Sequence, residues 1–228
     1  MKSKPGFLLR LSLVILFASC CTIANSQPFA AEIREFKKQD SLSFPPAGAI
    51  LFVGSSSFNF WKDVNQYFPG YTIINRGFGG SSLPDLIRYA DDIVFAYHPS
   101  QIVIYCGEND LAGSDTVTAQ IVFNRFLELF ELIRSRMEAV PIVYVSLKPS
   151  PSRQRLMPAM TRTNKMIRKF LNKQRNAVFA DVYHKMLNKD GSPIKEIFKE
   201  DQLHMNAKGY SIWQKVLQPY LLKPKQQS

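Results

Sequence analysis

Three consecutive serines, Ser55–Ser57, follow an apolar run that ends at Gly54, in "ILFVGSSSFNFW". A serine hydroxyl is a poor nucleophile until a neighbouring base takes its proton, and that base must itself be oriented by a third group. The same residues can form an ordinary polar turn, because clusters of glycine and serine commonly mark turns. The choice depends on whether the rest of the chain supplies a base and an acid.

The chain has three histidines, and His204 is the best available base. Asp201 lies three residues before it, so its carboxylate can hold one imidazole nitrogen if the loop curls, which leaves the other nitrogen free to face a serine. His98 precedes a proline in a polar loop, and His184 lies in a basic helical segment without an obvious orienting acid. The alternative for His204 is an ordinary surface histidine.

Acyl transfer also needs hydrogen-bond donors that point at the oxyanion developing in the transition state. The sequence "GFGGSS", residues 77–82, contains glycines that let a backbone N–H approach a substrate closely. Asn109 in "GEND" offers a side-chain amide immediately after an apolar run. Both segments can also be simple turns.

Regular elements must bring these distant segments together. Short apolar runs rich in β-branched residues recur at 49–53, 71–75, 101–106, 141–147 and 177–182. Such continuous runs are typical of strands buried on both faces. Amphipathic stretches with helical spacing lie at 118–137, 159–174 and 206–221. This alternation predicts an α/β fold with about five parallel strands, in which the polar segments meet at the carboxyl ends of the strands.

In this order and spacing, the four polar segments resemble the SGNH (GDSL-type) hydrolase family over residues 48–215. The resemblance assigns the nucleophile to Ser56, the third position of the family's Gly-Asp-Ser. It assigns the oxyanion hole to Ser56, Gly80 and Asn109, and the acid and base to Asp201 and His204. It also implies a three-layer α/β/α sandwich of the flavodoxin-like kind, and ester or thioester hydrolysis without a metal or a cofactor.

One position departs from the family pattern, because Ser55 replaces the aspartate of Gly-Asp-Ser. That aspartate does not accept the proton in the family, so activity is expected to survive. "GSSSF" also lacks the second glycine of the G-x-S-x-G elbow, which argues against an ordinary α/β-hydrolase. Within the family, "RGFGGS", "GEND" and "LHMNAKGY" are most similar to bacterial esterases related to the catalytic subunits of platelet-activating-factor acetylhydrolase.

The resulting expectation is a metal-free serine esterase that hydrolyses short-acyl esters through an acyl-enzyme. Bulky Phe58, Phe60 and Trp61 beside Ser56 suggest a tight cleft, although these aromatic residues could instead face the core. The alternatives are a carbohydrate O-deacetylase, a lysophospholipase or thioesterase, and a non-catalytic module that binds an anion at helix N-termini. The natural ester and the oligomeric state are not predicted.

The first 26 of the 228 residues are typical of an export signal, with Lys2, Lys4 and Arg10 before a short apolar core. We therefore expect a periplasmic or secreted protein with a signal peptide at 1–26, a hydrolase domain at 27–222 and a flexible tail at 223–228. The sequence "FASC" resembles a bacterial lipoprotein box, so the alternative is a lipid anchor at Cys20. No later stretch is long and apolar enough to cross a membrane.

The net charge of +11 is compatible with contact to an anionic lipid or polysaccharide surface. The cations are scattered, so nucleic acid is not expected as a partner. Lys148 and Arg153 in "SLKPSPSR" could line the mouth of the site and meet an anionic substrate, or could be solvated cations of a loop. Cys106 is the one cysteine outside the signal segment, and its place in "IVIYC" predicts a buried apolar residue rather than a disulfide or a metal ligand.

Overall fold

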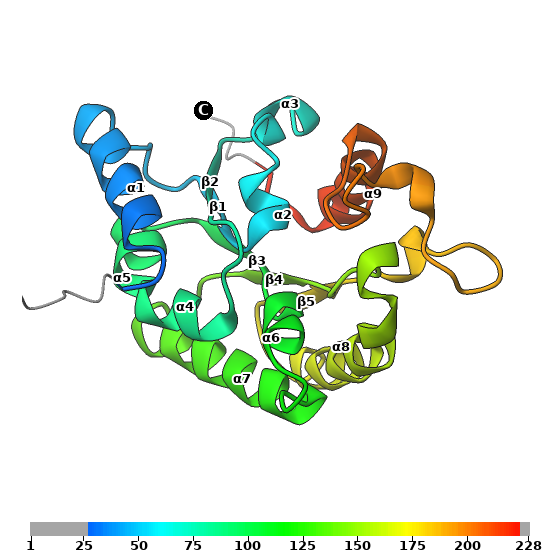
Figure 1. The fold of residues 1–228 in the computed structure, drawn as a ribbon. Coiled ribbons are helices and arrows are strands. Elements are labelled where there is room, and N and C mark those ends of the chain that lie inside the picture. Colours follow the sequence, from blue (N-terminus) through cyan, green and yellow to red (C-terminus); the bar gives the residue numbers. More distant parts are fainter. Residues whose placement is uncertain (1–26, 224–228) are drawn as a thin grey trace, which may run out of the picture.

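The computed structural model describes residues 27–223, which form a parallel sheet covered by helices on both faces (Figure 1). The strands are β1 (Ile50–Gly54), β2 (Ile73–Gly77), β3 (Gln101–Tyr105), β4 (Ile142–Val145) and β5 (Ala177–Ala180). Their order is β2-β1-β3-β4-β5, and every pair is parallel. Each predicted apolar run contains one strand. The order is that of flavodoxin-like folds, in which ligands bind where the direction of strand addition reverses.

The helices are α1 (Ala30–Leu42), α2 (Ser56–Asn59), α3 (Val64–Tyr67), α4 (Leu83–Arg88), α5 (Ala90–Ile93), α6 (Glu108–Gly113), α7 (Ala119–Arg136), α8 (Met157–Leu171) and α9 (Ala207–Leu217). Short 3₁₀ helices are η1 (Phe95–Tyr97), η2 (Pro151–Leu156), η3 (His184–Met186), η4 (Lys195–Ile197) and η5 (Gln218–Tyr220). The three predicted amphipathic stretches correspond to α7, α8 and α9. The sequence did not predict the helices before residue 114, most of which have four to six residues; the exception is α1, with 13 residues.

Alternate residues of each central strand point to opposite faces of the sheet, as the two-residue period of a strand requires. Leu51 and Val53 of β1 pack in the core shared with α1, α4, α5, α7 and α8. Ile50 and Phe52 pack in a second core with α2, α3 and α9. The two helical layers on either side of the sheet confirm the predicted α/β/α sandwich (Figure 1).

Burial on both faces fails at the edge strand β5. Residues of β1, β3 and β4 are buried throughout, whereas Val178 of β5 is 39% exposed. β5 pairs with β4 alone and lies at the end of the sheet, so helices cover it less completely than the central strands. An apolar run alone cannot distinguish a central strand from an edge strand.

The N-terminal helix α1 is attached to the other edge of the sheet by a buried polar cluster. Arg76 of β2 makes an ion pair with Asp40, and its Nε donates to the Tyr97 hydroxyl at 2.6 Å. The Tyr97 hydroxyl donates to the second oxygen of Asp40 at 2.5 Å. Phe29, immediately before α1, lies close to the glycine-rich loop after β2. The centroid of its ring is 5.2 Å from that of Phe78.

Cys106 is fully buried, as its place in an apolar run predicted. The proposed signal peptide, the alternative anchor at Cys20 and residues 224–228 lie outside the described residues. Within 27–223, none of the helices has the length and apolar character that a membrane span requires.

Candidate active site

The turn after β1 exposes one serine of the three. Gly54 has φ +153°, and a Cβ there would lie 2.0 Å from the carbonyl oxygen of Tyr105, so the position requires glycine. The chain then turns directly into α2. Ser55 and Ser57 are 2% and 1% exposed, whereas Ser56, the first residue of α2, is partly exposed. Ser56 is therefore the serine that a substrate can reach.

Ser56, His204 and Asp201 form a continuous hydrogen-bonded chain. The Ser56 Oγ lies 3.0 Å from Nε2 of His204, and Nδ1 of His204 lies 2.6 Å from Oδ2 of Asp201. The structure thus brings together three predicted site residues that are up to 148 positions apart in the sequence. This geometry lets the imidazole take the serine proton while the carboxylate fixes its orientation and tautomer.

The carboxylate of Asp201 is held in a tight local turn. Its Oδ1 accepts hydrogen bonds from the backbone N–H groups of Leu203 and His204, each at 2.9 Å. Partial burial raises the pKa of Asp201, but the hydrogen bonds from His204 and Leu203 outweigh this and lower the pKa to about 2. Asp201 is consequently ionised at neutral pH and can stabilise an imidazolium at His204.

Helix α9 fixes the position of the His204 loop relative to Ser56. Asn206 caps α9 by accepting hydrogen bonds from the N–H groups of Lys208 at 2.9 Å and Gly209 at 3.3 Å. One turn further on, the Tyr210 hydroxyl donates to the carbonyl oxygen of Ser57 at 2.9 Å. This contact joins α9 to α2, so the turn that carries His204, just before α9, is held next to the helix that begins at Ser56.

Of the three aromatic residues near Ser56, only Phe60 faces the site. Phe58 and Trp61 are fully buried in the core with α9, so they cannot wall a substrate cleft. Phe60 is 43% exposed, and its ring centroid lies 4.5 Å from that of His204. Lys199 places its Nζ 4.7 Å from the Phe60 ring centroid on the same rim.

Ser81 connects the segments that carry the predicted oxyanion donors. Its hydroxyl donates to the carbonyl oxygen of Phe78 at 3.0 Å and lies 3.3 Å from that of Gly54, at the end of β1. Its own carbonyl oxygen accepts from Nδ2 of Asn109 at 3.0 Å. Asn109 therefore lies beside the loop that contains Gly80, as the prediction required. Ser81 is completely buried, and only its place inside "GFGGSS" distinguished it in the sequence.

Gly80 lies on the exposed rim of this loop with φ +82°. A substituent at its Cβ would be strained by that backbone angle and would approach the ring of Phe29 at 3.8 Å. Among residues 27–223, the N–H groups of Ser56 and Gly80 have no hydrogen-bond acceptor. An oxyanion hole needs N–H groups that are free in this way.

A buried ionic cluster, formed by Glu108, Lys148 and Arg153, lies directly behind Asn109. Lys148 is 1% exposed, and its Nζ lies 2.9 Å from Oε2 of Glu108. Arg153 donates from Nη1 to Oε1 of Glu108 at 3.0 Å and from Nη2 to Oδ1 of Asn109 at 2.9 Å. The sequence had left two roles open for Lys148, a solvated loop cation or a free group at the mouth of the site. The structure shows neither, because Lys148 is buried and paired with Glu108.

The charges of this cluster stabilise one another. Burial raises the pKa of Glu108, but Lys148, Arg153 and the hydroxyl of Tyr105, which donates to Glu108, outweigh burial and lower it. Burial lowers the pKa of Lys148, and the neighbouring carboxylate opposes that shift. Glu108 is therefore a carboxylate that holds two cations. A glutamate next to Asn109 and two cations after the next strand were visible in the sequence, but their pairing was not predicted.

The segment that carries Arg153 also contacts the turn that carries the base. Ser152 donates to the carbonyl oxygen of Gln202 from its N–H at 3.1 Å and from its hydroxyl at 3.0 Å. Gln202, in the middle of the Asp201–His204 turn, has φ +53°. Residues 148–153 therefore join the asparagine side of the site to the histidine side.

The other two histidines lie elsewhere. His98 follows η1 with φ +44°, and its carbonyl oxygen accepts a hydrogen bond from the N–H of Gly48 at 3.4 Å. For His184 the sequence interpretation was wrong on one point, because an orienting acid is present. Its Nδ1 lies 2.8 Å from Oδ2 of Asp181, three residues earlier. Its side chain is nevertheless 66% exposed, and it has no serine partner among the described residues.

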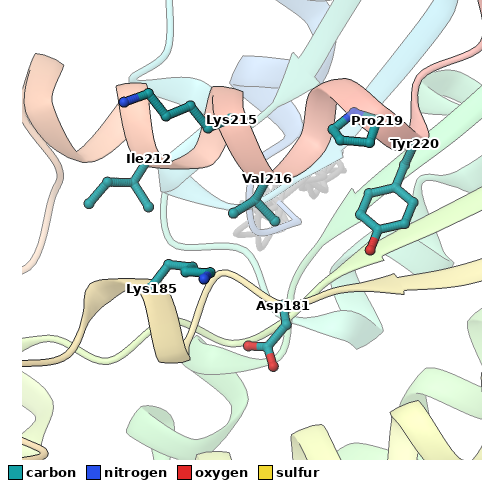
Figure 2. Close-up of a pocket in the computed structure, with 7 residues that line it drawn as sticks. All are labelled: Asp181, Lys185, Ile212, Lys215, Val216, Pro219 and Tyr220. Carbon is teal, nitrogen blue, oxygen red and sulfur yellow. The ribbon is translucent and has the colours of Figure 1, made fainter.

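A pocket of about 610 Å³ lies between the end of β5 and the outer face of α9 (Figure 2). Its lining consists of Asp181, Lys185, Ile212, Lys215, Val216, Pro219 and Tyr220. None of these is a predicted site residue, so this pocket is separate from the Ser56 centre. Across residues 27–223, no three His, Cys, Asp or Glu side chains gather closely enough to hold a metal ion.

Known structures share this fold at low sequence identity. A protein of Streptococcus pneumoniae, described provisionally as a platelet activating factor, superposes with a TM-score of 0.72 and 20% identity, over 84% of this chain and 92% of that one. A GDSL-like lipase from Bacteroides thetaiotaomicron superposes with a TM-score of 0.69 and 17% identity, over 83% of this chain and 97% of that one. An acetylxylan esterase from Geobacillus stearothermophilus, crystallised as a catalytic mutant, superposes with a TM-score of 0.60 and 14% identity, over 75% of this chain and 94% of that one.

The fold and the sequence pattern together define a class of protein, the SGNH-type ester hydrolases. Residues 40–212 match the GDSL-like lipase/acylhydrolase family, and the chain belongs to that family. A comparison with curated proteins finds no match.

Proposed function

We propose that this protein is a serine esterase that cleaves short-acyl esters through an acyl-enzyme formed on Ser56. The observation that carries the proposal is the hydrogen-bonded chain from Ser56 through His204 to Asp201. Among residues 27–223, the N–H groups of Ser56 and Gly80 are also free to bind an oxyanion. Simple binding of an anion at a helix N-terminus would need neither an imidazole nor an ionised carboxylate behind it.

In the first half of the reaction, His204 takes the Ser56 proton as the oxygen attacks the ester carbonyl. The developing oxyanion accepts hydrogen bonds from the N–H groups of Ser56 and Gly80 and from the Asn109 amide. His204 then gives its proton to the leaving alcohol, and the acyl group stays on Ser56. In the second half, His204 deprotonates a water that attacks the acyl-enzyme, and the acid leaves as Ser56 regains its proton.

The preference for short acyl groups is supported by the surroundings of Ser56. Phe29 approaches the Gly80 side of the site, and Phe60 stands against His204. The resemblance of this chain to acetylhydrolases also favours short acyl groups. Extra methylenes that find no surface to bury against do not stabilise the transition state.

A second candidate within the same chemistry is removal of acetyl groups from a carbohydrate. The acetylxylan esterase from Geobacillus stearothermophilus shares the fold, and the exposed Phe60 ring beside His204 is a surface on which a sugar could stack. Export from the cytoplasm, with an ordinary signal or a lipid anchor at Cys20, would bring the enzyme to such substrates. Mass analysis of the mature N-terminus would distinguish the two forms of export.

The deciding experiment combines a fluorophosphonate probe with an ester panel on the mature protein. Wild type should be labelled on Ser56, and Ser56→Ala should lose labelling and hydrolysis while its thermal unfolding is unchanged. Ser55→Ala and Ser57→Ala are the matched controls. Absence of labelling in the wild type would favour the anion-binding module instead.

p-Nitrophenyl esters of two to sixteen carbons, tested below their micelle thresholds, would define the acyl preference. We expect kcat/KM to peak between two and four carbons. A peak at eight or more would identify a lipase or lysophospholipase. Faster release of acetate from an acetylated sugar than from the simple acetyl ester would favour the deacetylase.

A further inference from the structure

We propose that Arg153 is a positioning residue for the oxyanion donor Asn109. This inference rests on the proposed function, because it requires Asn109 to donate a hydrogen bond to the reacting oxygen. The structure supplies three supports, which concern the orientation of the amide, its polarisation and the rigidity of Arg153 itself.

The first support is that Arg153 fixes which end of the Asn109 amide faces the substrate. An arginine guanidinium has only donors, so the atom 2.9 Å from its Nη2 must be the amide oxygen of Asn109. The amide nitrogen is then directed to the opposite side, where one N–H reaches the carbonyl oxygen of Ser81 at 3.0 Å. A primary amide has two N–H groups, so the second remains for an oxyanion.

The second support is electrostatic. A hydrogen bond from a charged donor is roughly twice as strong as a neutral one, and it polarises the group that accepts it. The guanidinium draws electron density toward Oδ1 of Asn109 and so makes its N–H groups better donors. In addition, the cluster sets two cations, Lys148 and Arg153, against the carboxylate of Glu108. The three side chains together carry one net positive charge, and Arg153 brings it into contact with the Asn109 amide.

The third support is that Arg153 is paired with a buried carboxylate. The side chains of Glu108 and Lys148 are 3% and 1% exposed, and that of Arg153 is 19% exposed. Glu108 and Asn109 are adjacent in the chain, so the forked guanidinium grips both with its two terminal nitrogens. A lysine at 153 could supply the charge but not the fork.

The test is a double-mutant cycle on a neutral short-acyl ester. We expect Arg153→Ala to lower kcat by about 10- to 100-fold and to leave KM within about twofold, because only transition-state stabilisation is weakened. Asn109→Ala should lower kcat by about 10²- to 10³-fold. Arg153→Ala added to Asn109→Ala should cost nothing further, since the group through which Arg153 acts is already gone.

Arg155 provides the matched control, because it lies two residues further on and pairs with Asp115 on the surface. Arg155→Ala should keep the wild-type kcat. If Arg153→Ala fails to fold, Arg153→Lys takes its place, and we expect it to lower kcat at unchanged thermal stability. Wild-type kcat in a folded Arg153 variant would overturn the proposal, and so would a loss that multiplies with that of Asn109→Ala.

Two further outcomes separate this inference from the proposed function. If fluorophosphonate does not label the wild type, the esterase itself is excluded. If the wild type is labelled but Arg153→Ala raises KM for an anionic ester alone, Arg153 binds the substrate and does not position Asn109.

Discussion

The chain contains two Asp-x-x-His turns, Asp181–His184 and Asp201–His204, in which the aspartate and the histidine make the same pair of hydrogen bonds. In each, the imidazole Nδ1 lies close to Oδ2 of the aspartate, at 2.8 Å in the first and 2.6 Å in the second. In each, the histidine N–H donates to Oδ1, at 3.3 Å and 2.9 Å. An aspartate that orients a histidine is therefore a local motif that this sequence forms twice.

The turns differ in what lies beyond the imidazole. Nε2 of His204 lies 3.0 Å from Ser56, and its side chain is 18% exposed. The side chain of His184 is 66% exposed, and its aspartate is shared with Arg168 in an ion pair. The turn at 181–184 follows the edge strand β5, whereas that at 201–204 leads into α9, which packs on α2. The place of each turn in the fold, rather than the turn itself, makes one of the two histidines a candidate base.

The largest expected effect separates the two histidines. His204→Ala should lower kcat/KM by a thousandfold or more, to about the level of Ser56→Ala, because serine and base act as a unit. His184→Ala should retain wild-type kcat/KM. Steady-state kinetics with a short-acyl ester measures both. Comparable losses in the two variants would show that the comparison is wrong.

The aspartates should differ in the same direction but less strongly. Asp201→Asn should lower kcat by about a hundredfold, because the amide no longer holds the imidazole in the tautomer that accepts the serine proton. Water can replace part of this interaction, since Asp201 is 48% exposed. Asp181→Asn is the control and should change kcat little. An inactive Asp181→Asn with unchanged thermal unfolding would assign the turn at 181–184 a role in the reaction.

Chemical modification should distinguish the histidines by exposure. Diethyl pyrocarbonate should react quickly with His184, whose ring is mostly open to solvent, without loss of activity. It should react slowly with His204, shielded by Phe60 and Ser56, and activity should fall in step with that slower reaction. Mass spectrometry of peptides taken during the reaction gives both rates. Inactivation that follows the modification of His184 would contradict this expectation.

The smallest effect concerns stability in acid. The folded pKa of Asp201, about 2, lies below the value of 3.8 for a free side chain. Its contribution to the free energy of unfolding is therefore complete above pH 3.8 and is lost as pH falls toward 2. The pKa of Asp181 is also lowered, because hydrogen bonds from His184 and Arg168 outweigh the effect of burial.

Urea unfolding of wild type, Asp201→Asn and Asp181→Asn between neutral pH and pH 2 would measure these contributions. Each variant should be slightly less stable than wild type at neutral pH, by an amount typical of surface pairs. The differences should shrink below pH 4. A difference that grows in acid would reverse the assigned sign.

Much of the fold could be predicted from the sequence, because each strand is a compact apolar run and α7, α8 and α9 have clear helical periodicity. The short helices α2, α3 and α5 could not, since four residues carry no period. The exposure of Val178 was also missed, because strand order decides which strand forms the edge. The hydrophobic pattern of the sequence indicates where helices and strands form, whereas the elements that pack beside them in the fold decide how far they are buried.

For the site, the resemblance indicated which residues to examine, and the structure shows that they meet. The cluster of Glu108, Lys148 and Arg153 was not predicted, because both cations are at least 40 residues from Glu108 in the sequence. Considered singly, each of the three residues is typical of a surface charge. The pairing of His184 with Asp181, three residues earlier, was not predicted, because the basic segment around His184 has a helical pattern and does not itself indicate a turn.

The contact between Tyr210 and Ser57 joins two segments that are 153 residues apart, and this has a consequence for the newly made protein. At roughly 5–20 residues per second, His204 is synthesised about 7–30 s after Ser56. Until α9 docks on α2, Ser56 has no base and is an ordinary alcohol. Ser56 is thus unreactive while the chain is being synthesised. A fluorophosphonate applied to nascent or refolding chains would label only the molecules in which α9 has docked on α2.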